Sequence, residues 1–215
     1  MPVVHLVRHG QASFGADDYD VLSDLGQRQA AVVGTELVRR GLGSALSVCG
    51  TLRRQRDTAL LALPGVAPTV DGRWDEYDHL ELLKRYTASP SGTAPADPRP
   101  QGVQHLLDEA LAGWVADGDD GGWPAFSGGA ARALADVAVA LDKGSAAVVF
   151  TSGGVIAAIC AALLGTGAEG VVALNKVAVN GAITTVLVGT SGTSLLSFND
   201  HAHFAGPGGE LLTYR

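Results

Sequence analysis

The stretch VVHLVRHG, residues 3–10, decides how the chain is interpreted. Its first five residues are apolar apart from His5 and rich in β-branched side chains, and Gly10 ends the run, so the pattern predicts a short buried strand. Arg8 and His9 follow at the carboxyl end of that strand. In open α/β sheets, ligands bind in the crevice beyond the carboxyl ends of the strands. Arg8 and His9 are therefore candidate site residues, the alternative being a strand-ending histidine beside a surface arginine.

The rest of the chain alternates between predicted strands and helices. Residues 45–49 and 146–150 form two further short apolar runs, each followed by a turn and a helical pattern. This rhythm predicts parallel strands with helices packed against them. Residues 182–188 and 194–198 are expected to close the sheet as a β-hairpin. The fold class is therefore α/β, a three-layer αβα sandwich with a mostly parallel central sheet and an inserted cap.

The expected helices are recognised by their caps and their apolar faces. Ser23 is a suitable N-cap for the first helix. The apolar face of that helix is expected to comprise Ala30, Val33, Leu37 and Val38. Later helical patterns cover residues 101–115, 130–141 and 155–164.

The length of 215 residues fits one domain over residues 1–215. From about 71 to 124 the rhythm lapses into a loop-rich segment that includes the Pro- and Gly-rich residues 89–95. Long loop-rich segments inside a compact domain are usually functional or disordered. We interpret residues 71–124 as a cap inserted into the domain.

Composition limits the partners of the chain. Hydrophobic residues make up 47% of the sequence and charged residues 17%, which excludes a disordered protein. The net charge of −7 argues against a nucleic acid or an anionic membrane as the main partner. Cys49 and Cys160 lie in apolar surroundings without metal-ligand spacing, so buried, reduced thiols and a cytoplasmic location are expected. The N-terminus also lacks the features of a signal peptide.

One segment, residues 144–165, is apolar and long enough to be considered as a membrane span. The sequence Thr-Ser-Gly-Gly at 151–154 interrupts it. A buried strand, a glycine turn and a helix explain the same residues without a membrane, and this is the interpretation we favour.

Three loops that follow predicted strands are expected to converge: residues 8–10, 50–54 and 151–154. The second loop places Arg53 and Arg54 in the first turn of a helix, where cations face the positive end of the helix dipole. A bound anion would remove this conflict, because helix N-termini donate N–H groups to phosphate and arginine adds a bidentate fork. The loops therefore indicate an anion site, the alternative being a solvated arginine-rich turn.

At these loops the chain resembles the histidine phosphatase superfamily, which includes cofactor-dependent phosphoglycerate mutases and many phosphomonoesterases. The resemblance covers nearly the whole length and rests on five motifs in the order of the family. They are Leu6–Gly10, Leu22–Ala30, Leu52–Arg54 followed by Thr58–Ala59, Trp74–Glu76, and Asn199–His203.

The resemblance implies a role for each matching residue. His9 is expected to be the nucleophile that takes the phosphoryl group on nitrogen. Arg8 and Arg54 are expected to bind the phosphoryl oxygens, so no metal and no cofactor is expected. Glu76 is expected to protonate the leaving alcohol.

Two neighbours compete with Glu76 for the role of the acid. Asp75 and Asp78 lie within two residues of it, and the sequence does not separate the three carboxylates. An exposed acid in an acidic loop is a further alternative for Glu76.

The chain departs from the family pattern at Ser152, which stands where the family has its second catalytic histidine. Ser152 and Gly153 are still expected to bind the phosphoryl group, but a donor able to carry positive charge is replaced by a neutral hydroxyl. Losing one preorganised donor costs about 10²- to 10³-fold in rate, against total accelerations of up to roughly 10²¹-fold for phosphate monoesters. His79 is the best sequence candidate to supply the missing charge.

The sequence thus predicts a metal-independent phosphomonoesterase of reduced activity that acts on a small phosphorylated metabolite through a phosphohistidine. One alternative is a non-catalytic phospho-ligand binding or regulatory protein, in which Ser152 marks lost turnover. A phosphoglycerate mutase is less favoured, because the asparagine that mutases carry near position 15 is absent. A small phosphorylated substrate is the expected partner, with neither nucleic acid nor membrane, and a homodimer is left open.

Overall fold

The computed structural model describes residues 1–13, 19–89, 100–189, 192–206 and 209–214. In this part of the chain six strands form one sheet in the order β3-β2-β4-β1-β5-β6. The strands are β1 (Val3–Arg8), β2 (Leu46–Cys49), β3 (Thr69–Val70), β4 (Ala146–Thr151), β5 (Ile183–Gly189) and β6 (Gly192–Asp200). The helices are α1 (Asp24–Arg39), α2 (Arg53–Ala62), α3 (His79–Ala88), α4 (Pro100–Asp117), α5 (Trp123–Val139), α6 (Gly153–Leu164) and α7 (Ala168–Val177), with the short 3₁₀ turns η1 (Gly72–Trp74) and η2 (Ala202–Phe204).

The sheet is mostly parallel, as predicted. Strand β1 pairs in parallel with β4, and β2 pairs in parallel with β4 and with β3. Strand β5 is antiparallel to β1 and joins β6 in the expected hairpin. The parallel strands therefore bring their carboxyl ends to one edge of the sheet.

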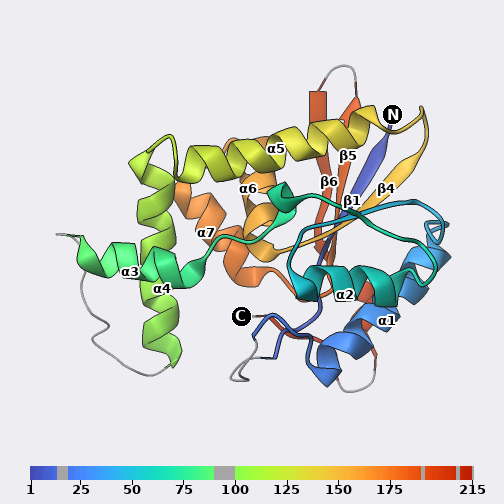
Figure 1. Cartoon of the computed structure of the whole chain (residues 1–215), viewed down its shortest axis with the longest axis horizontal. Helices are drawn as coiled ribbons and strands as arrows, with labels where there is room; N and C mark the ends of the chain where they lie inside the picture. The colour runs from blue at the N-terminus through green and yellow to red at the C-terminus, as the bar shows by residue number, and fades with distance from the viewer. Residues whose placement is uncertain (14–18, 90–99, 190–191, 207–208, 215) are drawn as a thin grey trace.

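Helices cover both faces of the sheet, which confirms the three-layer sandwich (Figure 1). The alternation of side chains along β1 assigns each residue to a layer. Val4 and Leu6 pack with α5 and α6 on one face. Val7 packs with α1 and α2 on the other face. Both cysteines are free and buried, as expected.

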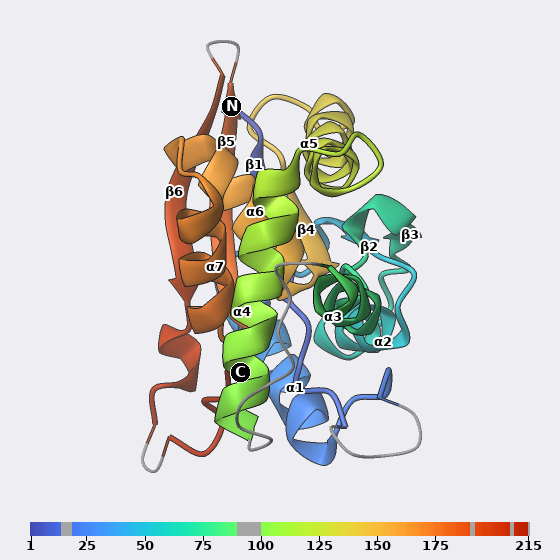
Figure 2. The same cartoon turned by 90° about the vertical axis from the view of Figure 1, so that its left-hand side faces the viewer.

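A third apolar cluster lies beside the sandwich and joins α3 and α4 to α6 and α7 (Figure 2). Its centre is aromatic, with the ring of Tyr77 5.5 Å from that of Trp114 and 5.9 Å from that of Phe126. The Pro-rich residues 90–95, on which the cap interpretation partly depended, lie outside the described residues. The boundaries of the cap, 71–124, stay a prediction.

Two expectations about helices were wrong. Helix α5 begins at Trp123, seven residues before the predicted start, with Pro124 in its first turn, where the missing N–H costs nothing. Val38 is 64% exposed and does not belong to the buried face of α1. It lies one residue, about 100° of helix rotation, beyond the buried Leu37.

The apolar segment 144–165 folds as β4 and α6 joined by a tight turn, as predicted. Within the described residues, no helix combines the length and the apolar character needed to cross a membrane.

His5 lies on β1 among the strands, and its burial changes its pKa. Its Nδ1 is 3.2 Å from the hydroxyl oxygen of Thr185. Burial, with a smaller effect of the Arg40 charge, lowers the pKa of His5 to about 4. Folding therefore favours the neutral imidazole.

We predict that His5 makes stability depend on pH between about 6.5 and 4. The unfolded chain takes up a proton on His5 near pH 6.5, whereas the folded chain does so only near pH 4, so stability falls as the pH drops through this window. The change in urea midpoint between pH 7 and pH 4.5 should be smaller in His5→Gln than in the parent. Burial also lowers the pKa of His203, which adds a loss of stability of the same sign to both proteins. Equal changes in the two proteins would contradict the assignment to His5.

Candidate active site

The three loops predicted to converge do so at the carboxyl ends of β1, β2 and β4. The backbone N–H of His9 donates to the carbonyl oxygen of Thr151 at 2.9 Å. The N–H of Gly50 donates to the carbonyl oxygen of Phe150 at 3.3 Å. The parallel pairing thus continues past the ends of the strands and holds the loops against one another.

His9 is 5% exposed and has both ring nitrogens engaged. Its Nδ1 lies 2.7 Å from the carbonyl oxygen of Gly10. A carbonyl can only accept, so Nδ1 carries the proton and Nε2 presents its lone pair. The Nε of Arg54 donates to that Nε2 at 3.1 Å. These two contacts therefore fix the tautomer in which the Nε2 lone pair is available.

The backbone beside His9 needs glycine. A Cβ at Gly10 would lie 2.4 Å from the carbonyl oxygen of Gly26 in α1. The N–H of Gly10 donates to the hydroxyl of Thr58 in α2, at 3.1 Å. The close approach holds the loop after β1 against both helices of that layer.

Arg8 is buried and is held by the segment that precedes β5. Its Nη1 donates to the carbonyl oxygen of Ala178, and its own carbonyl accepts from the N–H of Gly181 at 2.9 Å. A Cβ at Gly153 would lie 3.5 Å from Nε of Arg8. The guanidinium of Arg8 is therefore next to the first turn of α6.

Arg54 reaches His9 from the first turn of α2. Its Nη1 donates to Oδ1 of Asp20 at 2.7 Å, and its guanidinium lies 5.5 Å from the ring centre of Tyr19. Oδ2 of Asp20 accepts from the N–H of Arg53 at 2.7 Å. The anion expected at this helix N-terminus is thus supplied by the protein itself.

The three neighbouring carboxylates have different partners. Glu76 accepts from the N–H of Gly154 in α6, at 3.1 Å. Asp75 binds the N–H and the hydroxyl of Thr51 at 2.6 and 2.5 Å. Asp78 caps α3. Of the three, Glu76 is therefore the one that contacts the loop at 151–154.

Gly154 is required by this contact. A Cβ at position 154 would lie 2.2 Å from Oε1 of Glu76 and 2.5 Å from the ring of Tyr77. The second glycine of the loop thus admits the carboxylate to the N-terminus of α6.

Ser152 is fully buried. Its hydroxyl accepts from Nε2 of Gln55 at 2.8 Å, and the same Nε2 donates to the carbonyl oxygen of Trp74 at 2.9 Å. The partner of the hydroxyl is therefore Gln55 and not His79. The ring of His79 contacts that of Tyr19, with centres 5.9 Å apart.

Sequence reasoning missed Asp20 and Gln55. Asp20 stands in an acidic run just before the Leu22–Ala30 motif, and Gln55 is a polar residue at a buried position of α2. The position of Gln55 on the buried side of α2 is a usable signal, because a buried amide needs hydrogen-bond partners.

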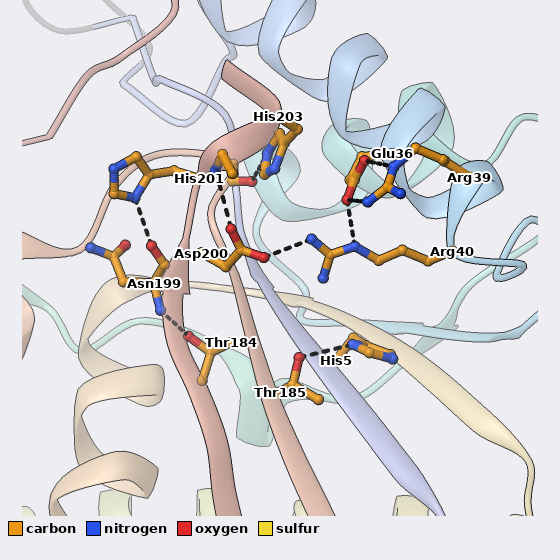
Figure 3. A network of polar contacts seen from close by, with 12 residues as sticks. His5, Glu36, Arg39, Arg40, Thr184, Thr185, Asn199, Asp200, His201 and His203 are labelled. Carbon is orange, nitrogen blue, oxygen red and sulfur yellow. Dashed lines mark hydrogen bonds and ion pairs between the residues drawn. The ribbon is translucent and has the colours of Figure 1, made fainter. Parts of the chain in front are cut away.

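The C-terminal motif, Asn199–His203, takes part in a network of polar contacts (Figure 3). Asn199 adopts the left-handed conformation, φ 58°, which asparagine tolerates. Its side-chain oxygen accepts from the N–H of Val179 at 2.8 Å, and its amide donates to the carbonyl oxygen of Val177 at 2.8 Å. Ala178, the acceptor for Arg8, lies between them. Asn199 therefore fixes the backbone that holds Arg8.

Asp200 ties the same motif to α1 through ion pairs (Figure 3). Arg40 donates to Asp200 at 2.7 Å and to Glu36 at 2.6 Å. Hydrogen bonds from Arg39 and from Arg40 outweigh the burial of Glu36 and lower its pKa to about 2. The motif therefore acts in the scaffold.

In the described residues, no three His, Cys, Asp or Glu side chains are placed to hold a metal ion. The ring of His9 instead accepts from the guanidinium of Arg54.

Comparisons with known proteins identify the family and the fold of the chain. A sequence model of the histidine phosphatase superfamily (branch 1) matches residues 4–201. The chain therefore belongs to this superfamily. No curated protein matches the chain in a sequence comparison.

Solved structures share the fold over nearly their whole length. A variant of phosphoserine phosphatase from Entamoeba histolytica, in complex with phosphoserine, has a TM-score of 0.67 and 18% identity, and covers 94% of this chain and 99% of its own. Mycobacterial glucosyl-3-phosphoglycerate phosphatase has a TM-score of 0.61 and 23% identity, with 92% and 98% covered. At these identities the likeness shows the fold alone.

The burial of Ser152 leads to a prediction about restoring histidine. Ser152→His alone should not raise turnover of an aryl phosphate, because the larger ring meets Gln55 in a packed interior. The double variant Ser152→His with Gln55→Ala should turn over the aryl phosphate faster than the single variant. The gain should reach up to about 10²-fold if the imidazole becomes a donor to the phosphoryl group.

Gln55→Ala alone is the control for the space that this change creates. A single Ser152→His variant as active as the double variant would show that Gln55 does not obstruct the histidine.

Proposed function

We propose that the protein is a phosphomonoesterase that hydrolyses a small phosphorylated metabolite through a phosphohistidine on Nε2 of His9. The observation that carries the proposal is the state of this imidazole. Gly10 holds the proton on Nδ1, while Nε2 faces the guanidinium of Arg54. A nucleophile next to fixed positive charge is what phosphoryl transfer requires.

In the first step, the Nε2 lone pair forms the N–P bond as the ester P–O bond breaks. Arg54 shifts its Nε donation from the imidazole to a phosphoryl oxygen, and Arg8 stabilises another. Gly153 begins α6, so its backbone N–H has no intrahelical acceptor and donates to the same group. Glu76, carrying a proton, gives it to the leaving oxygen and releases an alcohol.

In the second step, the carboxylate of Glu76 takes a proton from water as the water oxygen attacks phosphorus. The N–P bond breaks, inorganic phosphate leaves, and the Nε2 lone pair is restored. The two arginines provide the positive charge in both steps, so the mechanism proposed needs no metal or cofactor.

One observation favours the second candidate, a non-catalytic protein that binds a phosphorylated ligand. The Ser152 hydroxyl is buried against Gln55, so it does not replace the charge of the family histidine. On the phosphatase proposal the same feature lowers the rate without abolishing it. The sequence argument against a mutase concerns position 15, which lies outside the described residues. A homodimer and a cytoplasmic location stay predictions.

We predict that His9 is labelled during turnover. Rapid acid quenching is avoided because phosphohistidine is acid-labile; an alkaline quench with labelled substrate should place the label on the peptide that contains His9. His9→Ala should lose the label and at least about 10³-fold of the turnover. His5→Gln, outside the site, is the control. Full turnover in His9→Ala would refute the mechanism, and phosphate binding without any turnover in the parent would favour the non-catalytic candidate.

We predict that Glu76→Gln damages poor leaving groups most. Alkyl phosphates need a proton on the departing oxygen, so their turnover should fall by about 10²- to 10⁴-fold, whereas activated aryl phosphates should lose far less. Asp75→Asn and Asp78→Asn test the two competing acids. Because these carboxylates bind Thr51 and cap α3, any loss they cause should be equal for the two substrate classes. Equal losses on both substrate classes in Glu76→Gln would remove the assignment.

A further inference from the structure

Asp20 holds two groups at the N-terminus of α2. Its Oδ1 accepts from Nη1 of Arg54 and its Oδ2 from the backbone N–H of Arg53, each at 2.7 Å. Leu52, the N-cap residue of α2, offers no side-chain cap. The carboxylate thus takes the place of a capping side chain and binds the arginine as well.

The atoms that Asp20 and His9 contact belong to different edges of the Arg54 guanidinium. Nε and Nη2 point along one edge of the planar fork, and Nη1 lies on the far side. Asp20 binds Nη1, whereas Nε donates to His9. The edge formed by Nε and Nη2 is therefore directed at the nucleophile, where it can bind two phosphoryl oxygens at once.

Tyr19 limits the movement of the same guanidinium from another direction. Its ring centre is 5.5 Å from the central carbon of the Arg54 guanidinium. An arginine side chain loses rotamer freedom when it is fixed, so a second contact helps to define its orientation. Two consecutive residues before α1 thus fix an arginine in the first turn of α2.

Affinity for phosphate does not explain a carboxylate at this position. A negative charge paired with Arg54 reduces the attraction of the pocket for a phosphate dianion. Orientation does explain it, because a bidentate arginine is effective only when the correct edge faces the charge that develops in the transition state.

We propose that Asp20 is a positioning residue, which holds Arg54 with its Nε–Nη2 edge facing the phosphoryl group on His9. The proposal rests on the proposed function for its kinetic consequence. The orientation of Arg54 itself is a property of the protein without substrate.

The test compares Asp20→Asn with Asp57→Asn. The first keeps the shape of the side chain and removes its charge. The second removes an aspartate of α2 that pairs with Arg53 at 3.6 Å and leaves Arg54 unaltered. Asp20→Asn should lower kcat by about 10- to 100-fold, the scale of a small misplacement in an active site. The KM and the inhibition constant of inorganic phosphate should change less than about threefold, and Asp57→Asn should match the parent.

A second readout needs no turnover. The ¹⁵N–¹H signal of the Arg54 Nε should be slow to exchange in the parent and in Asp57→Asn, because it is hydrogen-bonded to His9, and should exchange faster in Asp20→Asn. An unchanged signal overturns the proposal, even if the parent proves inactive. An unchanged kcat in an active protein also overturns it, as does tighter phosphate binding at constant kcat, which would make Asp20 a competitor of the substrate.

Discussion

The parallel pairing of β1 with β4 is the constraint on which the site depends. Six consecutive residue pairs, from Val3 with Ala146 to Arg8 with Thr151, set the register. A slip of one residue would turn every side chain of β1 to the opposite layer, so the separate packing of Val4 and Val7 keeps the strand in place. Where the register ends, the loop that carries His9 meets the first turn of α6. Hydrophobic burial thereby determines the distances between polar groups.

Carboxylates give the site its order in a protein with a net charge of −7. Asp20 holds Arg54, Asp75 holds Thr51, and Glu76 occupies the N-terminus of α6. Each acid is bound to a cation or to a backbone N–H. These partners offset the free-energy cost of removing a carboxylate from water. The arginines of the site are thus held in place within a protein of negative net charge.

Five of the six strands could be predicted because they depend on local patterns, whereas the two-residue strand β3 was not expected. Short apolar runs indicated β1, β2 and β4, and the glycines that follow indicated the loops. Helix α5 was found only in part, since Pro124 and the glycines at 128–129 resemble a turn in sequence while the helix is stabilised by packing. Asp20 and Gln55 escaped prediction for a different reason. Their partners Arg54 and Ser152 lie 34 and 97 residues away in the chain. No local sequence pattern indicates contacts between residues so far apart.

Arg8 is made well before the residue whose carbonyl accepts from its Nη1, because Ala178 lies 170 residues later in the chain. Asn199, which fixes the backbone on either side of Ala178, is made later still. Until those residues are made, the nascent chain therefore carries His9 without the contacts that order the neighbouring Arg8. The loop after β1 gains this support only when β6 has been added to the sheet.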